Sequence, residues 1–438
     1  MTAPGLIVAA PASGSGKTVV TLGLMRALRD AGLAVAPFKV GPDYIDPAFH
    51  AAACGRDTTN LDCWAMRPAT LDGLAAGLSE AADIVVGEGV MGLFDGLGDG
   101  TGSTADLAAR FAWPVVLVVD VDAQAESAAA VVGGFARHRD DVSIAGVIFN
   151  RVAGPAHKAL LRRACEAAAL PPVLGAVPRD SRLAVAERHL GLVQAVEHAD
   201  LALLIEAAAA VVGAAIDREA LIAAARRARG LDAAPSPTPL PPLGSRIAVA
   251  FDPAFTFAYP WLIEGWRTAG AEIVVFSTLA DEAPDLAADA VYLPGGYPEL
   301  HAGRLAAAPN FLGGLRAAAQ RGATVYGECG GYMVLGRGLI DREGERHAMA
   351  GLAPLETSFA GGRPALGYRR VTARRETPLG PAGSRFRGHE FHAAEILAEG
   401  GERLFDCAAA SGRALAPTGH AGGNVFGSFV HLLDREAG

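Results

Sequence analysis

The sequence predicts an α/β fold in which two parallel sheets are each covered by helices. Short apolar runs alternate with Ala- and Leu-rich helical segments, a Gly-rich loop joins the first run to a helix at residues 11–18, and five prolines gather between residues 235 and 242. Strands buried on both faces have continuous apolar patterns, so such runs are typical of parallel sheets. We therefore expect two doubly wound domains joined by an extended linker.

The expected elements follow in chain order. In the first domain, residues 1–229, strands are predicted at residues 6–10, 33–40, 84–86, 115–119, 144–149 and 173–177, and an Ala-rich helix at residues 207–229. The Pro-rich linker covers residues 230–245. In the second domain, residues 246–438, strands are predicted at residues 246–251, 271–276, 290–293 and 323–326. Each run is short and is followed by turn residues, as expected for strands that lead into crossover helices.

Composition excludes several classes of protein. The net charge of −9 and the scattered basic residues give no patch for nucleic acid or an anionic membrane. Apolar stretches stop at acids well before the roughly 20 residues of a membrane span, and the N-terminus has no signal-peptide pattern. The five cysteines contain no C-x-x-C pair, which argues against a disulfide framework or a thiolate zinc site. We expect a cytoplasmic protein.

The loop after the first expected strand has the sequence SGSGKT at residues 13–18 and leads into a helix. The backbone amides of Gly14, Ser15 and Gly16 can cradle phosphates, Lys17 can reach the outer phosphates, and the Thr18 hydroxyl can hold Mg²⁺. The strict G-x-x-x-x-G-K-T pattern has glycine where this chain has proline at position 11. The order of strand, loop and helix nevertheless predicts an ATP and Mg²⁺ site.

Acidic residues follow two of the neighbouring strands. Glu88 ends the apolar run that starts at residue 84, and Asp43 and Asp46 lie three residues apart in the segment KVGPDYIDP. Carboxylates at the carboxyl ends of strands can hold Mg²⁺ and its waters, so Glu88 and Asp43 join Thr18 as expected metal ligands. Aspartates in Pro-rich turns are also common as caps. Asp120 and Asp122 end another strand. One of them could complete the metal shell, but we interpret them as turn residues.

Two further polar residues lie where a doubly wound domain presents its base-binding loops. Asn150 follows the strand at residues 144–149, and Arg179 follows the strand at residues 173–177. Both are expected to contact the nucleotide.

The second domain carries a nucleophile motif. Residues 327–333 read GECGGYM after an apolar strand, which is the G-x-C-x-G pattern of a strained strand-to-helix turn. Cys329 is the expected nucleophile, with its pKa lowered at the helix N-terminus. The amide of Gly330, with that of Gly296 or Tyr297 from another loop, can hold an oxyanion. His431, at the end of an apolar strand, is the expected base.

His389 and His392 lie in RGHEFH at residues 387–392. The spacing H-E-x-H differs from the helical zinc motif H-E-x-x-H, so we interpret these histidines as surface or substrate-contact residues.

Taken together, the motifs resemble the corrinoid amidase family over nearly the whole chain. The N-terminal half is similar to a dethiobiotin-synthetase-like P-loop domain, and the C-terminal half to a class I glutamine amidotransferase. Within the family, the chain is similar to the a,c-diamide synthases of cobyrinic or hydrogenobyrinic acid. Four segments carry this similarity: SGSGKT from residue 13, KVGPDYIDP from residue 39, GEGVMGLFDG around Glu88, and GECGGYM from residue 327.

The resemblance implies an ATP- and glutamine-dependent ligase of cobalamin biosynthesis. Cys329 and His431 would release ammonia from glutamine through a thioester. ATP would phosphorylate the c and then the a acetate of a corrinoid carboxylate, with Asp43, Asp46 and Glu88 serving metal binding and carboxylate activation, and ammonia would convert each acyl phosphate to an amide. The resemblance also implies a homodimer.

One position departs from ordinary amidotransferases of this type. They carry an acid two residues after the catalytic histidine, where this chain has Leu433. The corrinoid branch commonly lacks that acid, so we expect a Cys329–His431 dyad. Asp434 is the nearest acid in the sequence.

Two alternatives stay open. The first is an amidase of another tetrapyrrole, either cobyric acid synthase, against which GPDYIDP argues, or nickel-sirohydrochlorin a,c-diamide synthase. The second is an ATP-driven switch with a non-catalytic amidotransferase-like module, as in partitioning ATPases. Those ATPases carry a signature lysine where this chain has Pro11, and the intact G-x-C-x-G motif also argues against this alternative.

Overall fold

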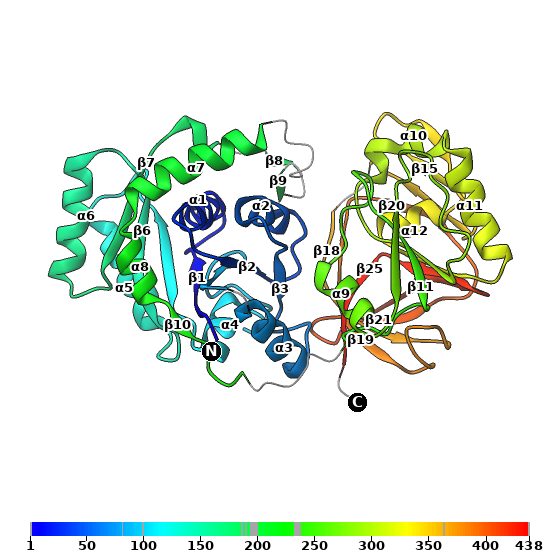
Figure 1. Cartoon of the computed structure of the whole chain (residues 1–438), viewed down its shortest axis with the longest axis horizontal. Helices are drawn as coiled ribbons and strands as arrows, with labels where there is room; N and C mark the ends of the chain where they lie inside the picture. The colour runs from blue at the N-terminus through cyan, green and yellow to red at the C-terminus, as the bar shows by residue number, and fades with distance from the viewer. Residues whose placement is uncertain are drawn as a thin grey trace. The chain divides into compact units, whose positions relative to one another are not determined.

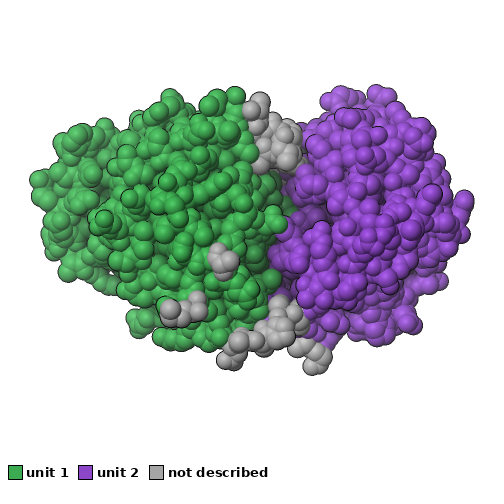
Figure 2. Space-filling model, viewed as in Figure 1, with its two compact units in different colours: residues 1–64, 71–236 green, residues 65–70, 237–438 purple. Residues whose placement is uncertain are grey.

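The chain folds into two compact units, which we describe separately. The computed structural model describes residues 2–80, 82–98, 100–184, 187–188, 191–192, 200–231, 238–361 and 364–436. Residues 1–64 and 71–236 form unit 1, and residues 65–70 and 237–438 form unit 2 (Figure 2). The predicted linker spans the division between the units, and its residues 232–237 lie outside the described residues.

Unit 1 is built on an eight-stranded sheet (Figure 1). The order is β3-β2-β4-β1-β5-β6-β7, all parallel, with β10 pairing antiparallel to β1. The strands are β1 (Pro4–Ala9), β2 (Val35–Val40), β3 (Thr59–Leu61), β4 (Ile84–Glu88), β5 (Val115–Asp120), β6 (Ile144–Val152), β7 (Val173–Pro178) and β10 (Arg226–Arg227), and β8 (Glu187–Arg188) pairs separately with β9 (Gly191–Leu192). The six predicted strands of this domain are therefore confirmed, and β1 lies between β4 and β5 so that the loop after it starts near the middle of the sheet edge.

The helices of unit 1 follow the strands in the expected alternation. They are α1 (Lys17–Asp30), α2 (Ile45–Cys54), α3 (Pro68–Ser79), α4 (Thr104–Phe111), α5 (Ser127–His138), α6 (Pro155–Ala167), α7 (Leu201–Ala215) and α8 (Arg218–Ala224). α3 begins among residues that belong to unit 2. α1 and α7 pack side by side, and a side chain at Gly23 would place its Cβ 2.5 Å from the carbonyl oxygen of Ala208.

The prediction of one continuous helix at residues 207–229 is wrong. α7 ends at Ala215, and Ile216 takes an extended conformation and bridges to Gly175. Asp217 is also extended, and its carboxylate accepts a hydrogen bond at 3.0 Å from the amide of Ala220, which caps α8. Aspartate competes for backbone donors in this way and therefore starts a new helix.

Unit 2 has its own parallel core sheet, ordered β12-β11-β13-β14-β24-β23, in which only β23 runs antiparallel. Its strands are β11 (Arg246–Ala250), β12 (Glu272–Phe276), β13 (Ala290–Leu293), β14 (Thr324–Glu328), β23 (His420–Gly422) and β24 (Val425–Ser428), and its helices are α9 (Pro260–Thr268), α10 (Ala302–Ala306), α11 (Pro309–Gln320) and α12 (Gly330–Leu335). The four predicted strands of this domain are thus confirmed as β11 to β14.

Two further sheets in unit 2 were not predicted. One has the order β22-β21-β18-β19-β25 and the other β16-β15-β17-β20. Their strands are β15 (Gly338–Ile340), β16 (Arg346–Ala348), β17 (Leu355–Ser358), β18 (Ala365–Ala373), β19 (Arg385–His392), β20 (Glu395–Glu399), β21 (Phe405–Ala409), β22 (Ala414–Thr418) and β25 (Val430–Arg435). Many residues of β18, β20 and β22 are exposed, so these strands lack the continuous apolar pattern of the parallel strands.

Glycine allows a tight contact in the core of unit 1. Gly87 in β4 lies under the ring of Phe38 from β2, and a Cβ there would approach three ring atoms within 2.0–2.4 Å. We expect Gly87→Ala to lower the free energy of unfolding by about 1–3 kcal/mol, because a packed core resists an added methyl group. Urea denaturation measures this. Gly77→Ala, in α3 with no atom within 4 Å of the new Cβ, is the control and should be neutral or stabilising by up to about 1 kcal/mol. Equal effects of the two changes would contradict the packing argument.

Among the described residues, no helix combines the length and apolar character that crossing a bilayer requires.

Candidate active sites of the two units

The phosphate loop of unit 1 has the backbone that its glycines allow. Gly14 and Gly16 have φ values of 78° and 83°, a left-handed region that favours glycine. Gly16 is the residue before α1, and a Cβ there would lie 2.2 Å from Asn150 Nδ2. The Ser15 hydroxyl donates to the carbonyl of Ala12 at 2.9 Å. The first amides of α1 therefore lie at the loop, where the helix dipole favours a phosphate.

Asn150 supports this loop. From β6 its side-chain amide donates to the carbonyl of Ser15 at 3.0 Å, and it is buried. The structure thus brings Asn150 to the loop backbone. Arg179 is not brought there, because its exposed guanidinium forms an ion pair with Asp122. Asp120 pairs in the same way with Arg151, so the acids after β5 are paired with arginines.

Glu88 is the centre of a buried polar cluster in unit 1. It is the last residue of β4 and is fully buried. Its carboxylate accepts from the Thr18 hydroxyl at 2.7 Å, contacts His50 Nε2 at 2.6 Å and forms an ion pair with Lys39 Nζ at 3.0 Å. Burial by itself raises the pKa of Glu88, but the Lys39 charge and the hydrogen bonds from His50 and Thr18 outweigh it and hold that pKa well below its usual range.

The second part of the cluster comes from β2 and the start of α2. Lys39 Nζ lies 2.5 Å from Asp46 Oδ2 and 3.8 Å from Asp43 Oδ2, and it is almost completely buried. Asp43 also accepts from the amides of Ile45 and Asp46 at 2.8 and 3.3 Å, so it caps α2 as well. Burial and the neighbouring Asp43 raise the pKa of Asp46 to about 7, although Lys39 opposes this. The structure therefore brings Asp43, Asp46, Glu88 and Thr18 into one site.

Lys17 lies at the same site. It is buried, and desolvation lowers the pKa of its amine, with repulsion from Lys39 adding to this and Glu88 opposing it. Two buried lysines beside the phosphate loop supply the local positive charge that an anionic substrate needs in a chain of net negative charge.

Sequence reasoning missed two members of this cluster. Lys39 lies inside the KVGPDYIDP segment, and His50 follows that segment by three residues. A signal existed for each of them. A lysine inside an apolar strand needs a charged partner, and His50 lies four residues after Asp46 in α2, which places both side chains on one helix face.

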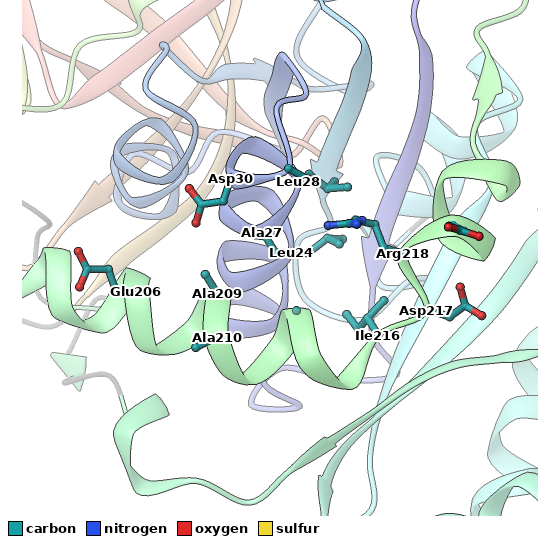
Figure 3. A pocket seen from close by; sticks show the side chains of 13 residues that line it. Leu24, Ala27, Leu28, Asp30, Glu206, Ala209, Ala210, Ile216, Asp217 and Arg218 are labelled. Carbon is teal, nitrogen blue, oxygen red and sulfur yellow. The ribbon is translucent and has the colours of Figure 1, made fainter.

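A cavity of about 690 Å³ lies elsewhere in unit 1, between α1 and α7 (Figure 3). Its walls include Leu24, Ala27, Ala209 and Gly213. It contains none of the predicted site residues, so it is not part of the site described above.

In unit 2 the predicted strand-to-helix turn is present at Cys329. β14 ends at Glu328, α12 starts at Gly330, and Cys329 between them has φ 46° and ψ −105°, a strained conformation for a residue with a side chain. A Cβ at Gly331 would lie 2.0 Å from the carbonyl oxygen of Leu293, so only glycine allows α12 to approach β13 this closely. The Cys329 thiol is directed toward the carbonyl of Phe391, with a separation of 3.6 Å.

The two predicted oxyanion donors lie close together. A Cβ built on Gly330 would be 3.0 Å from the backbone nitrogen of Gly296. A Cβ on Gly296 would be only 2.0 Å from the carbonyl oxygen of Ala254, so glycine is required at that position too. Two backbone nitrogens next to the nucleophile are the arrangement that stabilises an oxyanion.

His431 borders the same loop. A Cβ on Gly295 would lie 2.4 Å from His431 Cε1, and the ring of His431 stacks on that of His389 at 4.9 Å. The Tyr259 hydroxyl and His389 Nε2 are 3.0 Å apart. Burial, with repulsion from His389 and His392, lowers the pKa of His431 well below its usual value, which keeps the imidazole neutral and able to accept a proton.

The expectation of a lowered pKa for Cys329 is wrong for this structure. Burial of the thiol raises its pKa, the Glu299 charge raises it further, and the backbone hydrogen bond involving Gly330 only partly opposes them. The thiol is 1% exposed, and in such a site desolvation outweighs a short helix. A thiol with a raised pKa reacts as a nucleophile only when a base removes its proton.

Comparisons with known proteins identify the family of each of the two domains. Residues 6–193 match the family of CobQ/CobB/MinD/ParA nucleotide-binding domains, and residues 246–437 match the CobB/CobQ-like glutamine amidotransferase domains. Hydrogenobyrinate a,c-diamide synthase of Brucella ovis is 55% identical over 434 residues, which is 98% of each chain. The enzymes of the same name from Rhizobium meliloti and Rhodobacter capsulatus are 54% and 53% identical, cover 98% of this chain, and are themselves covered over 99% and 98% of their length.

The two matched domains and these relatives define a glutamine-dependent amidating ligase that uses ATP. The chain belongs to the hydrogenobyrinate a,c-diamide synthase family.

Proposed function

We propose that this enzyme amidates the a and c acetate carboxylates of hydrogenobyrinic acid, with ATP as phosphoryl donor and glutamine as nitrogen donor. The observation that carries the proposal is the 53–55% identity to synthases of that name over nearly the full length of both chains. The names of these relatives favour hydrogenobyrinic over cobyrinic acid, the two substrates that the sequence left open. In this proposal residues 1–229 form the ATP-dependent amidoligase domain and residues 246–438 the glutaminase domain.

At the glutaminase site the chemistry is acyl transfer. The thiol proton of Cys329 moves to the imidazole of His431, and the sulfur attacks the amide carbon of glutamine. The amides of Gly296 and Gly330 hold the negative oxygen of the tetrahedral intermediate. The imidazolium returns its proton to the leaving nitrogen, so ammonia departs and a thioester remains, which water hydrolyses to glutamate and free thiol.

At the synthetase site the chemistry is phosphoryl transfer to a carboxylate. A carboxylate is a poor electrophile, and phosphorylation gives it a leaving group that ammonia displaces. The amides of Gly14, Ser15 and Gly16 bind ATP phosphates, while Lys17 neutralises charge on the transferred phosphoryl group. Lys39, held by Asp46 and Glu88, is the second cation available to the phosphoryl group or the acetate. Asn150 acts by bracing the loop.

The residues present fit Mg²⁺. The Thr18 hydroxyl and the Glu88 carboxylate are hard oxygen donors 2.7 Å apart at the start of α1, and the Asp43 carboxylate lies in the same cluster. Mg²⁺ bound there would neutralise charge that develops on the phosphates. ATP and glutamine are cytoplasmic metabolites, and we place the enzyme in that compartment. The homodimer stays a prediction.

A competition assay tests the proposal. The purified chain receives ATP, Mg²⁺, glutamine and an equal mixture of hydrogenobyrinic and cobyrinic acids, and mass spectrometry follows the products. We expect hydrogenobyrinate diamide to form first, with no product when ATP is left out. Preference for cobyrinic acid would contradict the substrate assignment. No amide from either acid, together with no glutamine hydrolysis, would favour the ATP-driven switch.

A further inference from the structure

The base of the glutaminase site receives no carboxylate from its own strand. Residue 433, two positions after His431 in β25, is a buried leucine. The one acid of this strand, Asp434, is also buried, and it accepts from the Arg67 amide at 2.8 Å and from the Arg67 guanidinium at 2.7–2.9 Å. The carboxylate of Asp434 is therefore engaged by Arg67.

A carboxylate reaches His431 from a different strand. Glu328 ends β14 immediately before Cys329, and its side chain is almost completely buried. Glu328 Oε2 lies 3.9 Å from His431 Nδ1. Glu328 Oε1 accepts from the amide of Leu432 at 3.3 Å, so the carboxylate contacts the backbone next to the histidine as well as facing its ring.

Two phenols fix this carboxylate in place. The Tyr326 hydroxyl donates to Oε1 at 2.6 Å, and the Tyr292 hydroxyl donates to Oε2 at 2.8 Å. Both tyrosines are buried, their rings stack at 5.7 Å, and burial beside Glu328 raises the pKa of each, so both remain donors. Among the described residues, no lysine or arginine pairs with Glu328. An acid in such surroundings costs stability, and a functional role accounts for its presence better than a structural one.

We propose that Glu328 is the positioning residue of the glutaminase site and performs the role that the missing acid at position 433 has in related enzymes. This inference rests on the proposed function of Cys329 and His431. The Glu328 carboxylate orients the imidazole through Nδ1 and stabilises the imidazolium that forms when the thiol proton arrives. The S–H bond breaks, an N–H bond forms on the imidazole, and the new positive charge faces the carboxylate.

The ionisation of Glu328 gives the proposal a pH signature. Burial raises the pKa of Glu328 to about 7, while the two phenols and the Leu432 amide oppose the rise. The ionised form therefore appears as pH increases through about 7, and glutaminase kcat should fall as pH decreases through that value. The other titratable or charged groups around His431 are His389 and His392, which both have lowered pKa values, with Tyr259, Arg369 and Glu390 beyond them.

Glu328→Gln in the full chain is the direct test, because glutamine keeps the size of the side chain and removes its charge. We expect glutaminase kcat to fall by about 10–100-fold, less than the roughly 10⁴-fold loss in a Ser-His-Asp triad because the separation here exceeds hydrogen-bond distance. KM for glutamine should stay within about threefold, since the acid faces the base rather than the substrate. Amidation with free ammonia should be unchanged, and the decrease near pH 7 should disappear.

Tyr326→Phe is a second test that does not depend on how well the glutamine variant folds. Loss of one donor to the charged form should raise, by about one unit, the pH below which glutaminase kcat decreases. The kcat at high pH should stay nearly unchanged. Tyr332→Phe is the control. It removes a buried hydroxyl that donates to Glu399 at 3.0 Å instead, so it should not change the pH dependence of glutaminase kcat.

The inference is overturned if folded Glu328→Gln enzyme keeps the wild-type glutaminase kcat and the same decrease of kcat near pH 7. Loss of ammonia-dependent amidation in that variant would overturn it too. Absence of glutaminase activity in the wild-type chain would instead overturn the proposed function, and the inference with it.

Discussion

Cys329→Ser is expected to lower glutamine-dependent amidation by at least about 10³-fold, because the hydroxyl is a far weaker nucleophile than the thiol in a site built for sulfur. Amidation with free ammonia should stay within about twofold of the wild type, since the residues of the synthetase site are untouched. Rates of diamide formation with each nitrogen source, measured by mass spectrometry, check both statements.

The matched control is Cys407→Ser. Cys407 is another buried cysteine of unit 2, on β21, and has no role in the proposed reaction. This variant should keep both activities. Loss of both activities in folded Cys329→Ser enzyme would contradict the assignment of glutamine hydrolysis and amidation to two separate sites.

The second large effect is expected at Glu88. Glu88→Gln removes the carboxylate that accepts from Thr18 and pairs with Lys39. We expect amidation to fall by about 10²–10³-fold with either nitrogen source, because both the metal ligand and the partner that orients a buried lysine are lost. Glutamine hydrolysis should continue, because Cys329 and His431 belong to unit 2, and the far-UV circular dichroism of the wild type should be retained if the variant has folded.

Asp122→Asn is the control for this change. Asp122 is an acid after the neighbouring strand β5, and it forms an ion pair with Arg179 at the protein surface. We expect amidation within about twofold of the wild type, as for other exposed ion pairs. A loss equal to that of Glu88→Gln would assign the metal to the acids after β5 instead.

Local patterns were sufficient for much of the fold and part of the site. The runs at residues 115–119 and 290–293 are apolar throughout, and they form central strands of the two parallel sheets. The phosphate loop and the turn at Cys329 could also be predicted from the sequence, because a few neighbouring glycines impose each backbone path. The two sheets formed after residue 338 could not be predicted, because many of their residues are exposed and some of their strand pairs, such as β19 with β25, join segments that are distant in the sequence.

The residues that sequence reasoning missed depend on contacts between distant segments. Glu88 is 38 residues from His50 in the sequence, and Lys39 lies on the neighbouring strand β2. Only the order of β2, β4 and β1 brings these side chains together. Glu328 is part of the GECGGYM motif, but its partners Tyr292 and His431 come from β13 and β25. Spacing along the sequence has no information on such neighbours.

The sequence by itself determined the two α/β domains, the phosphate loop, the strand-to-helix turn at Cys329 and the family resemblance, because each depends on a short run of residues whose backbone or chemistry is local. Only the tertiary structure decided the electrostatics. It placed Lys39 among three carboxylates, engaged Asp434 with Arg67, directed Glu328 toward His431 and raised the pKa of Cys329. Charge interactions and desolvation depend on the distances between groups and on their burial, and neither quantity follows from the order of the residues alone.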